Sequence, residues 1–448
     1  MSFRALPLLL VFSSTFYTAA TAVSSSTLLL ARSRSATPNA GAPLSAWAAS
    51  VAAQSAADTA RVASMLTPAP APAPVGKGKP AKPPKNKGNS PVPIAPGRKI
   101  LSIPNYVARA GLGTPAQTLL VAIDPSNDAA WVPCSACAGC VSSPSFSPTQ
   151  SSTYRTVPCG SPQCAQVPSP SCPAGVGSSC GFNLTYASST FQAVLGQDSL
   201  ALENNVVVSY TFGCLRVVTG NSVPPQGLIG FGRGPLSFLS QTKGTYGSVF
   251  SYCLPNYRSS NFSGTLKLGP VGQPKKIKTT PLLYNPHRPS LYYVNMVGIR
   301  VGSKVVPVPQ SALAFNPVTG SGTIIDAGTM FTRLAAPVYA AVRDAFRSRV
   351  RTPVAAPLGG FDTCYNVSVS VPTVTFMFAG AVTVTLPEEN VMIHSSSGGI
   401  ACLAMAAAPS DGVNAALNVL ASMQQQNQRV LFDVANGRVG FSRELCTA

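Results

Sequence analysis

The stretch AGLGTPAQTLLVAIDPSNDAAWVPCSACAGC, residues 110–140, carries the most informative structural pattern of the sequence. It places Asp124 at the end of an apolar run and follows it with a turn-forming Pro-Ser-Asn sequence. The arrangement returns 202 residues later, where GTIIDAG (322–328) ends its own apolar run in Asp326. One such aspartate alone is most simply a turn former, but a carboxylate emerging from a buried strand is costly without partners or a function. We therefore expect two similar lobes that bring both aspartates to a cleft.

Short runs of alternating apolar residues continue from Tyr106 to the C-terminal region and predict many short strands. These runs are YVARAGL, TLLVAID, VVVSYTFG, GTLKLG, LYYVNMVGIRV, VPTVTFMFA, AVTVTL and RVLFDVANGRVGFS. Helical spacing is clearest in residues 337–350, where Val338, Val342 and Phe346 would share one face. The pattern predicts an all-β protein with few short helices.

The first 98 residues differ in composition and predict segments that precede the folded region. Residues 1–22 combine Arg4, an apolar run and a final Ala-Thr-Ala, which predicts a secretory signal peptide. Residues 23–98 predict a propeptide, weakly helical around residues 46–66, and then a Pro/Lys-rich linker (67–98) unable to form a packed core. The Ser- and Ala-rich composition leaves a chloroplast transit peptide as the alternative. No later run approaches the roughly 18 apolar residues of a membrane span.

Twelve cysteines and three Asn-x-Ser/Thr sequons indicate an oxidising compartment outside the cytoplasm. The even number of cysteines fits six disulfides, and in a secreted chain the C-x₂-C-x₂-C start favours disulfides over a metal site. The disulfide candidates are Cys134, Cys137, Cys140, Cys159, Cys164, Cys172, Cys180, Cys214, Cys253, Cys364, Cys402 and Cys446. The glycosylation candidates are Asn183, Asn261 and Asn366.

The formal net charge of +19 raises the question of nucleic-acid binding. Residues 1–99 hold 11 of the 32 basic residues and one of the 13 acidic residues, and their lysines lie among Pro and Gly. That setting is typical of a solvated segment and not of an element that reads a groove. We expect contact with an acidic cell-wall polyanion before contact with nucleic acid.

Three motifs together resemble the pepsin-family (A1) aspartic proteases: residues 110–140, GTIIDAGTMFTRL (322–334) and SMQQQNQRVLFDVANGRVGFSRELC (422–446). More narrowly they are similar to the plant nepenthesin-like branch, which includes apoplastic proteases and a chloroplast nucleoid DNA-binding protease. The resemblance spans residues 100–448 and implies a bilobal, pepsin-like double β-barrel with an active-site cleft between the lobes.

The resemblance also implies the domain limits. The N-terminal lobe would span residues 99–280 and include a Cys-rich insert at 134–180, and the C-terminal lobe would span residues 281–448. Cys364 and Cys402 would pair within the second lobe. The product would be a secreted, glycosylated, monomeric zymogen of the apoplast that uses no metal or cofactor and acts on protein or peptide substrates.

Asp124 and Asp326 would form the catalytic pair that the resemblance implies. The two carboxylates would share one proton, so that one activates water as a general base while the other donates to the scissile carbonyl. Trp131 would hydrogen-bond the flap tyrosine, Tyr186, which closes over substrate. The residues of the active-site loops would be Pro125, Ser126, Asn127, Ala327, Gly328 and Thr329.

The resemblance also implies which residues support the two active-site loops. The Thr329 hydroxyl would orient the second carboxylate, and Asn127 stands at the corresponding place by the first. Residues 228–230 (Leu-Ile-Gly) would support the first active loop, and Leu420 and Ala421 stand at the matching place in the second lobe.

Both active-site triplets depart from the family pattern, in which each aspartate is followed by Thr or Ser. Pro125 and Ala327 lack the hydroxyl that fixes the two carboxylates together, and Pro125 also lacks a backbone N–H. Because about 1 Å of misplacement can cost on the order of a hundredfold in rate, three hypotheses stay open. The chain is an acid-active endopeptidase, a catalytically impaired binding protein like the cereal xylanase inhibitors, or a plastid DNA-binding protein.

Overall fold

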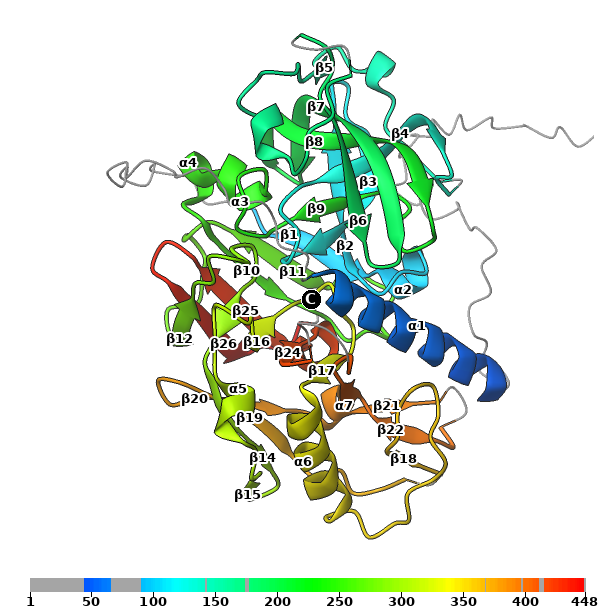
Figure 1. Ribbon diagram of the computed structural model, residues 1–448, viewed down its shortest axis with the longest axis vertical. Helices are drawn as coiled ribbons and strands as arrows, with labels where there is room; N and C mark the ends of the chain where they lie inside the picture. Colours follow the sequence, from blue (N-terminus) through cyan, green and yellow to red (C-terminus); the bar gives the residue numbers. More distant parts are fainter. Residues whose placement is uncertain are drawn as a thin grey trace, which may run out of the picture. The chain divides into compact units, whose positions relative to one another are not determined.

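Strands dominate the part of the chain that the structure, a computed structural model, describes, and helices are few (Figure 1). This confirms the all-β prediction. The described residues are 44–65, 90–141, 143–173, 177–366, 368–395, 398–410 and 415–446. The predicted signal peptide, residues 1–22, and most of the predicted linker lie outside them.

A continuous antiparallel sheet, here the central sheet, joins the two halves of the sequence. In spatial order its strands are β2 (Tyr106–Leu112), β1 (Val92–Pro96), β11 (Gly264–Leu268), β10 (Val249–Cys253), β25 (Gln428–Asp433), β26 (Arg438–Arg443) and β12 (Lys278–Leu283). The β10–β25 pair sets Tyr252 opposite Val430 and so links the lobes through backbone hydrogen bonds.

The position of β1 corrects the predicted linker. Residues 67–98 were expected to build no packed structure, yet residues 92–96 form a strand between β2 and β11. The alternating Val92 and Ile94 are both fully buried, because this short apolar segment lies in the interior of a sheet. Only residues before the strand can therefore act as a linker.

The N-terminal lobe is built on β3, which runs parallel to β9, and on the long β7–β8 pair. The strands of this lobe beyond the central sheet are β3 (Gln117–Asp124), β4 (Trp131–Ala138), β5 (Arg155–Thr156), β6 (Gly181–Tyr186), β7 (Ser189–Leu202), β8 (Asn205–Thr219) and β9 (Leu228–Gly230). β6 and β7 form a hairpin whose last paired residues are Tyr186 and Ser189. We call this hairpin the flap.

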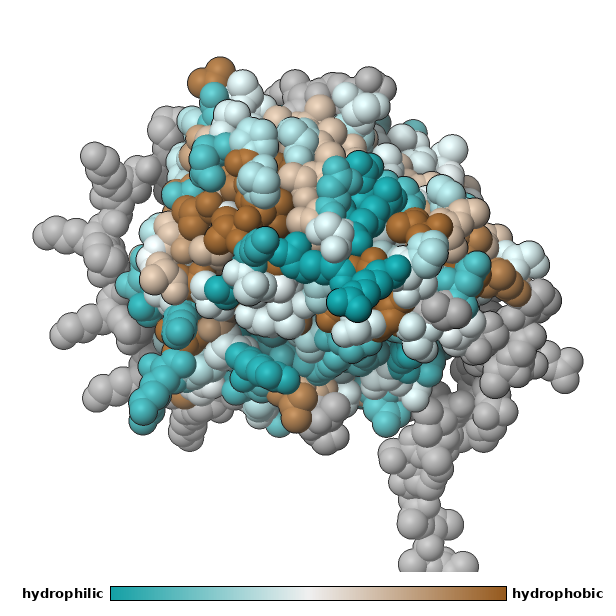
Figure 2. Space-filling model, turned by 90° about the horizontal axis from the view of Figure 1, so that it is seen from below, coloured by the Kyte–Doolittle hydropathy of each residue, from teal (hydrophilic) through white to brown (hydrophobic). Residues whose placement is uncertain are grey.

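The C-terminal lobe repeats the first arrangement, with β16 parallel to β24 and β17 parallel to β23. Its strands are β13 (Tyr293–Val294), β14 (Met296–Val301), β15 (Lys304–Val305), β16 (Gly322–Ile325), β17 (Thr332–Leu334), β18 (Cys364–Tyr365), β19 (Val374–Phe378), β20 (Val382–Leu386), β21 (Met392–His394), β22 (Ala401–Leu403), β23 (Met405–Ala407) and β24 (Leu417–Leu420). Figure 2 shows polar and apolar side chains interspersed on the face seen from below.

Helices α1 and α6 are the two long helices of the described residues, and both were predicted. Helix α6 ends three residues earlier than expected, and its buried face includes Val338, Val342 and Phe346, as the spacing indicated. No helix of the described ranges is both long and apolar enough to cross a membrane. The α-helices are α1 (Leu44–Ser64), α2 (Gly97–Ile100), α3 (Phe238–Gln241), α4 (Lys243–Tyr246), α5 (Gln310–Leu313), α6 (Ala336–Arg347) and α7 (Glu388–Val391), and the 3₁₀ helices are η2 (Pro148–Gln150), η3 (Cys164–Gln166) and η4 (Ser422–Gln425).

All twelve cysteines form disulfides, which confirms the expected number of six. The pairs are Cys134–Cys214, Cys137–Cys140, Cys159–Cys172, Cys164–Cys180, Cys253–Cys446 and Cys364–Cys402. The last pair is the one that the resemblance implied. Sulfur atoms in disulfides are not thiolates, so the close cluster of Cys159, Cys164 and Cys172 is no metal site.

Candidate active site

Asp124 and Asp326 occupy matching positions in the two lobes. Asp124 ends β3 beside Gly230 of β9, and Asp326 follows β16, whose last residue lies beside Leu420 of β24. Both aspartates are fully buried. The parallel neighbours β9 and β24 are the elements that the sequence assigned to support the two loops, and each lies next to its aspartate-bearing strand.

The Asp124 carboxylate accepts hydrogen bonds from the loop that follows it. Ser126 donates both its backbone N–H and its hydroxyl to Oδ1, each over 2.9 Å. Asn127 donates its side-chain amide to Oδ2, also over 2.9 Å. The loop thus fixes the orientation of the carboxylate, and it does so without any contribution from the side chain of Pro125.

The Asp326 carboxylate is held in the same way by its own loop. Gly328 donates its N–H to Oδ1 over 3.1 Å, while Thr329 donates its N–H over 2.8 Å and its hydroxyl over 2.6 Å to Oδ2. Ala327 is buried in the core and adds no polar contact to the carboxylate. The orientation of Asp326 by Thr329 is the arrangement that the resemblance implied.

A second set of bonds supports the dyad from the central sheet, and sequence reasoning missed it. The Gln425 side-chain amide donates to the backbone carbonyl of Asp326 over 3.0 Å and to that of Leu420 over 2.8 Å. Its own oxygen accepts the hydroxyl of Tyr252 from β10. These bonds anchor the loop that lacks a threonine or serine hydroxyl at Ala327. The Gln424–Gln426 run, buried throughout, was the available sequence signal.

The flap reaches the dyad through Tyr186. Its hydroxyl lies 3.4 Å from Asp124 Oδ2 and accepts the Asn105 amide over 3.3 Å. The expected hydrogen bond from Trp131 is wrong: the two rings meet edge to face at 5.4 Å, and Trp131 Nε1 has no partner among the described residues. The tyrosine hydroxyl is directed instead to the carboxylate and the asparagine. Ala187, the residue after Tyr186 at the flap tip, has a φ of 50°.

Helix α1 places Arg61 directly between the two aspartates. Its Nη2 lies 2.7 Å from Asp124 Oδ1 and 3.4 Å from Asp326 Oδ1, and its Nε lies 3.4 Å from Asp326 Oδ2. The same Nη2 donates to the Ser126 hydroxyl over 2.5 Å, and the guanidinium carbon lies 5.2 Å from the centre of the Tyr186 ring. One nitrogen therefore contacts both carboxylates, so the structure brings the two predicted aspartates together.

Burial and charge act in opposite directions on this cluster. Burial alone would lower the pKa of Arg61, but Asp124, Tyr186 and Asp326 outweigh it and hold that pKa well above its usual value. Burial would likewise raise the pKa of Asp326, but Arg61, Thr329 and the Gly328 N–H lower it below its usual value. Asp326 is therefore ionised and paired with Arg61 when α1 is bound.

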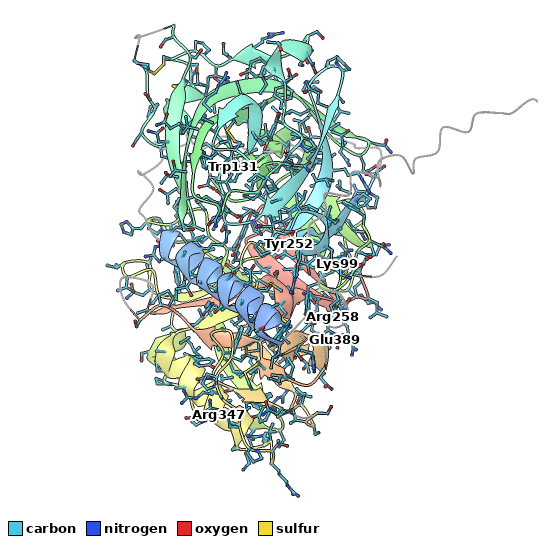
Figure 3. The ribbon with its side chains drawn as sticks, turned by 90° about the vertical axis from the view of Figure 1, so that its right-hand side faces the viewer. Lys99, Trp131, Tyr252, Arg258, Arg347 and Glu389 are labelled. Carbon is cyan, nitrogen blue, oxygen red and sulfur yellow. A yellow bond between two sulfur atoms is a disulfide. The ribbon has the colours of Figure 1, made fainter. Side chains whose placement is uncertain are left out.

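One face of α1 is buried along its whole length. Trp47 and Val51 pack with Met330, Phe331 and Phe361 in one apolar cluster, and Val62 packs in another around β16 and β24. Figures 1 and 3 show α1 lying between the two lobes. We call the surface that α1 covers beside the dyad, lined by the residues of these two apolar clusters, the groove.

Two glycines of the C-terminal lobe permit the close approach of α1. Gly359 and Gly360 have φ values of +60° and +84°, and a Cβ there would lie 2.9 Å from Val51 and 2.8 Å from Ser55. Both the left-handed backbone and the space favour glycine at these positions. The groove wall thus matches the helix that covers it.

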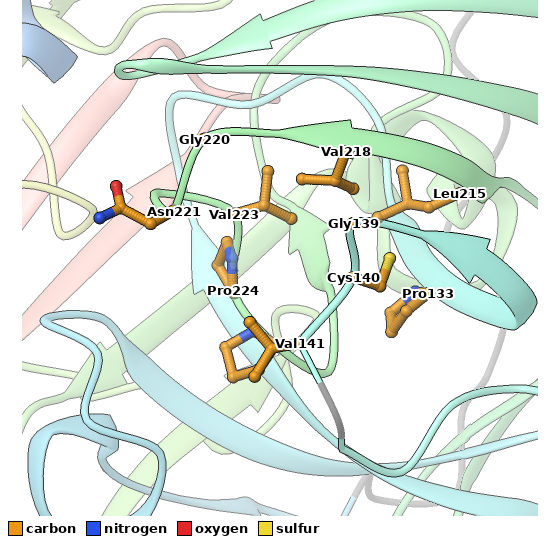
Figure 4. Close-up of a pocket in the computed structure, with 11 residues that line it drawn as sticks. Pro133, Gly139, Cys140, Val141, Leu215, Val218, Gly220, Asn221, Val223 and Pro224 are labelled. Atoms are coloured by element: carbon orange, nitrogen blue, oxygen red, sulfur yellow. The ribbon is translucent and has the colours of Figure 1, made fainter.

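A separate surface pocket lies in the N-terminal lobe (Figure 4). Val141, Leu215, Val218, Val223 and three prolines contribute to its lining, which contains neither aspartate of the dyad. It has no ionisable side chain, so it offers no group for acid, base or nucleophilic chemistry.

Comparisons with known proteins agree with this geometry. Two protein-family models match the chain, one described as "Xylanase inhibitor N-terminal" at residues 106–270 and one as "Xylanase inhibitor C-terminal" at residues 291–443. Among solved structures, Basic 7S globulin from soybean is similar with a TM-score of 0.61 and 24% identity, over 79% of this chain and 95% of the globulin chain. That likeness concerns the fold.

Curated relatives are more similar in sequence. Aspartyl protease 25 of Oryza sativa subsp. japonica is 48% identical over 378 residues, which cover 80% of this chain and 85% of the relative. Aspartic proteinase nepenthesin-1 of Nepenthes gracilis is 34% identical over 360 residues, which cover 77% of this chain and 78% of the relative. With its bilobal β fold and paired strand-end aspartates, the chain belongs to the pepsin-like A1 family of aspartic proteases.

Proposed function

We propose that this chain is the latent precursor of an aspartic endopeptidase with Asp124 and Asp326 as its catalytic dyad. The observation that carries the proposal is the contact of both carboxylates with the single guanidinium of Arg61. Two buried carboxylates at one point would be costly as purely structural groups. A cation that comes from a separate N-terminal helix, Arg61, offsets one of the two negative charges while it blocks access to the dyad.

After removal of α1 the two carboxylates would share one proton, because ionisation of both would place two negative charges side by side in a buried site at a high free-energy cost. The ionised carboxylate then takes a proton from a water molecule as the water oxygen bonds to the peptide carbonyl carbon. The protonated carboxyl donates to the carbonyl oxygen. Collapse of the tetrahedral intermediate breaks the C–N bond and transfers a proton to the departing amine.

The flap supports this role. Tyr186 approaches Asp124 from the N-terminal lobe at the place where a bound peptide would replace Arg61. A hairpin that can close over the peptide would exclude water other than the attacking molecule. Tyr186 therefore acts in substrate enclosure in this proposal, and Trp131 packs behind it.

We place the activating cleavage between α1 and β1. Cleavage at Arg98 or Lys99 would cut off β1, whose backbone pairs on both sides within the central sheet. A cut after Met65 and before Ser90 would release the helix and leave that sheet whole. The sequon residues Asn183, Asn261 and Asn366 are exposed, which suits glycosylation of a secreted protein.

A binding protein without catalytic activity is the second candidate. Pro125 and Ala327 favour it, because neither supplies the hydroxyl that the resemblance implies at these positions. The family models that match are described as xylanase inhibitor domains. Inhibition of a microbial xylanase by the processed chain would support this candidate.

Pepstatin-sensitive hydrolysis tests the two candidates against each other. The full chain is incubated at about pH 4, where one carboxyl of a dyad is protonated, with denatured globin in the presence and absence of pepstatin. We expect cleavage that pepstatin abolishes. Absence of such cleavage by chain that has lost α1 would rule out the protease and leave the binding protein.

A further inference from the structure

Strand β17 carries a buried arginine, Arg333, which donates its short hydrogen bonds to Ser55 of α1. Its Nη2 donates to the Ser55 carbonyl over 2.6 Å and to the Ser55 hydroxyl over 2.8 Å. Its hydrogen bond within the C-terminal lobe is longer, from Nη1 to the Ala407 carbonyl over 3.4 Å, and its Nε has no partner among the described residues. Loss of α1 therefore removes both short bonds of this guanidinium.

The carboxylate whose charge acts on Arg333 also lies on α1. Among the described residues, Asp58 is the one carboxylate whose charge raises the pKa of Arg333, against a larger lowering by burial. The Asp58 carboxylate accepts the backbone N–H groups of Met330 over 3.1 Å and Phe331 over 2.8 Å. In the precursor, the groove therefore binds the Asp58 carboxylate through two backbone N–H groups, and the charge of Arg333 acts on the same carboxylate.

We infer that Arg333 determines substrate specificity by binding an acidic side chain, Asp or Glu, in the part of the groove that α1 occupies. This inference rests on the proposed protease function and names one feature of its substrates. A substrate carboxylate would replace the contacts that Ser55 and Asp58 provide in the precursor.

The reason for an acid, and not merely any polar group, is the charge on Arg333. Backbone N–H groups such as those of Met330 and Phe331 can donate to a carbonyl oxygen as well as to a carboxylate oxygen. A guanidinium in a groove walled by apolar side chains gains most from an anion, because a neutral partner leaves its charge uncompensated. None of the ion pairs among the described residues involves Arg333, so its charge has no partner from the C-terminal lobe.

Paired peptides test this inference on the processed full chain. Each pair shares one cleavable apolar centre and differs only by Glu or Gln at one position, and kcat/KM is measured at about pH 5.5, where Glu is ionised. We expect about a tenfold preference for Glu at one position, the size of a charge-assisted hydrogen bond. The ratio within a pair is independent of the amount of active enzyme, so a poorly folding variant does not distort it.

Arg333→Gln should reduce the Glu/Gln ratio to about one, while Arg333→Lys should keep part of it. Arg443→Gln is the matched control, because Arg443 is exposed on β26 outside the groove. A wild-type ratio of about one at every position would overturn the inference even if all peptides are cleaved. So would a ratio that Arg333→Gln leaves unchanged.

A binding measurement separates this inference from the proposed function. Asp326→Asn chain that carries one inserted site for a sequence-specific endopeptidase between residues 66 and 89 is cut there and freed of α1 at acidic pH. Calorimetry then compares the affinities of each Glu/Gln pair. Preference for Glu without cleavage by wild-type chain would support the inference and reject the protease. Equal affinity within every pair would overturn the inference whatever the wild-type chain cleaves.

Discussion

Replacement of Arg61 by methionine is the perturbation that most directly tests latency. Methionine keeps an unbranched side chain of similar length, so helix propensity changes little, while the charge that bridges Asp124 and Asp326 is lost. Removal of one partner of a buried ion pair costs about 3–5 kcal/mol, because a charge is left buried and unpaired. That energy corresponds to a shift of about 10²–10⁴-fold in the equilibrium between bound and released α1.

The cost depends on pH. It is largest near neutral pH, where Asp326 is ionised, and smaller in acid, where Asp326 takes up a proton. Hydrogen exchange of the α1 amides, residues 44–64, measures helix release at neutral pH without relying on activity. We expect these amides to exchange at least about a hundredfold faster in Arg61→Met, and the lag before peptide cleavage in acid to shorten.

Two further variants serve as controls. Arg61→Lys keeps the charge but has one nitrogen in place of the planar fork, so it should give an intermediate effect. Ser50→Ala alters the exposed face of α1 and should match the wild type. Equal protection and equal lag in Arg61→Met and wild type would refute the role of Arg61 in latency.

Three other predictions follow from the same contacts. The pKa of Asp326 is lowered in the bound state, so Asp326 stabilises α1 binding above its ordinary pKa and loses that effect as pH falls below it. Burial raises the pKa of Asp58 to about 6, so Asp58 opposes binding above that pH and favours it as pH falls. Asp58→Asn should therefore remove the gain in α1 protection that the wild type shows as pH falls from about 6 to about 4, measured by hydrogen exchange, and an unchanged slope would contradict the assignment. Pro125→Thr with Ala327→Ser should raise kcat with little change in KM, if the missing hydroxyls limit the rate; steady-state kinetics that show no gain would mean that other bonds already hold the dyad. Gln425→Leu should lower kcat about tenfold at similar KM, because the Asp326 carbonyl loses its amide donor, and a kcat equal to wild type would show that this bond is dispensable.

Local patterns in the sequence were sufficient to predict much of the fold. The apolar runs before Asp124 and Asp326 predicted two strands ending in carboxylates, and both strands form with parallel neighbours. The spacing in α6 was correct because its apolar face is continuous and amphipathic. Such features depend on residues that are close in sequence, and so a single chain reveals them.

Contacts between distant segments could not be predicted in this way. Arg61 lies 63 residues before Asp124 and 265 before Asp326, and no local pattern distinguishes it from an ordinary surface arginine of an Ala-rich helix. The support of Asp326 by Gln425 and Tyr252 joins η4 to β10 across the central sheet. The segment containing β1 was assigned to the linker because its prolines obscure a strand whose partners lie far along the chain.

The most direct measurement compares peptide hydrolysis by processed wild-type chain and by Asp326→Asn chain cut at the same linker site. Both are assayed at about pH 4 with and without pepstatin, after circular dichroism shows that both are folded. We expect pepstatin-sensitive hydrolysis by the wild type and only background hydrolysis by Asp326→Asn. Wild-type chain that has lost α1, is folded and yet cleaves nothing, or an Asp326→Asn chain that cleaves equally well, would contradict this expectation.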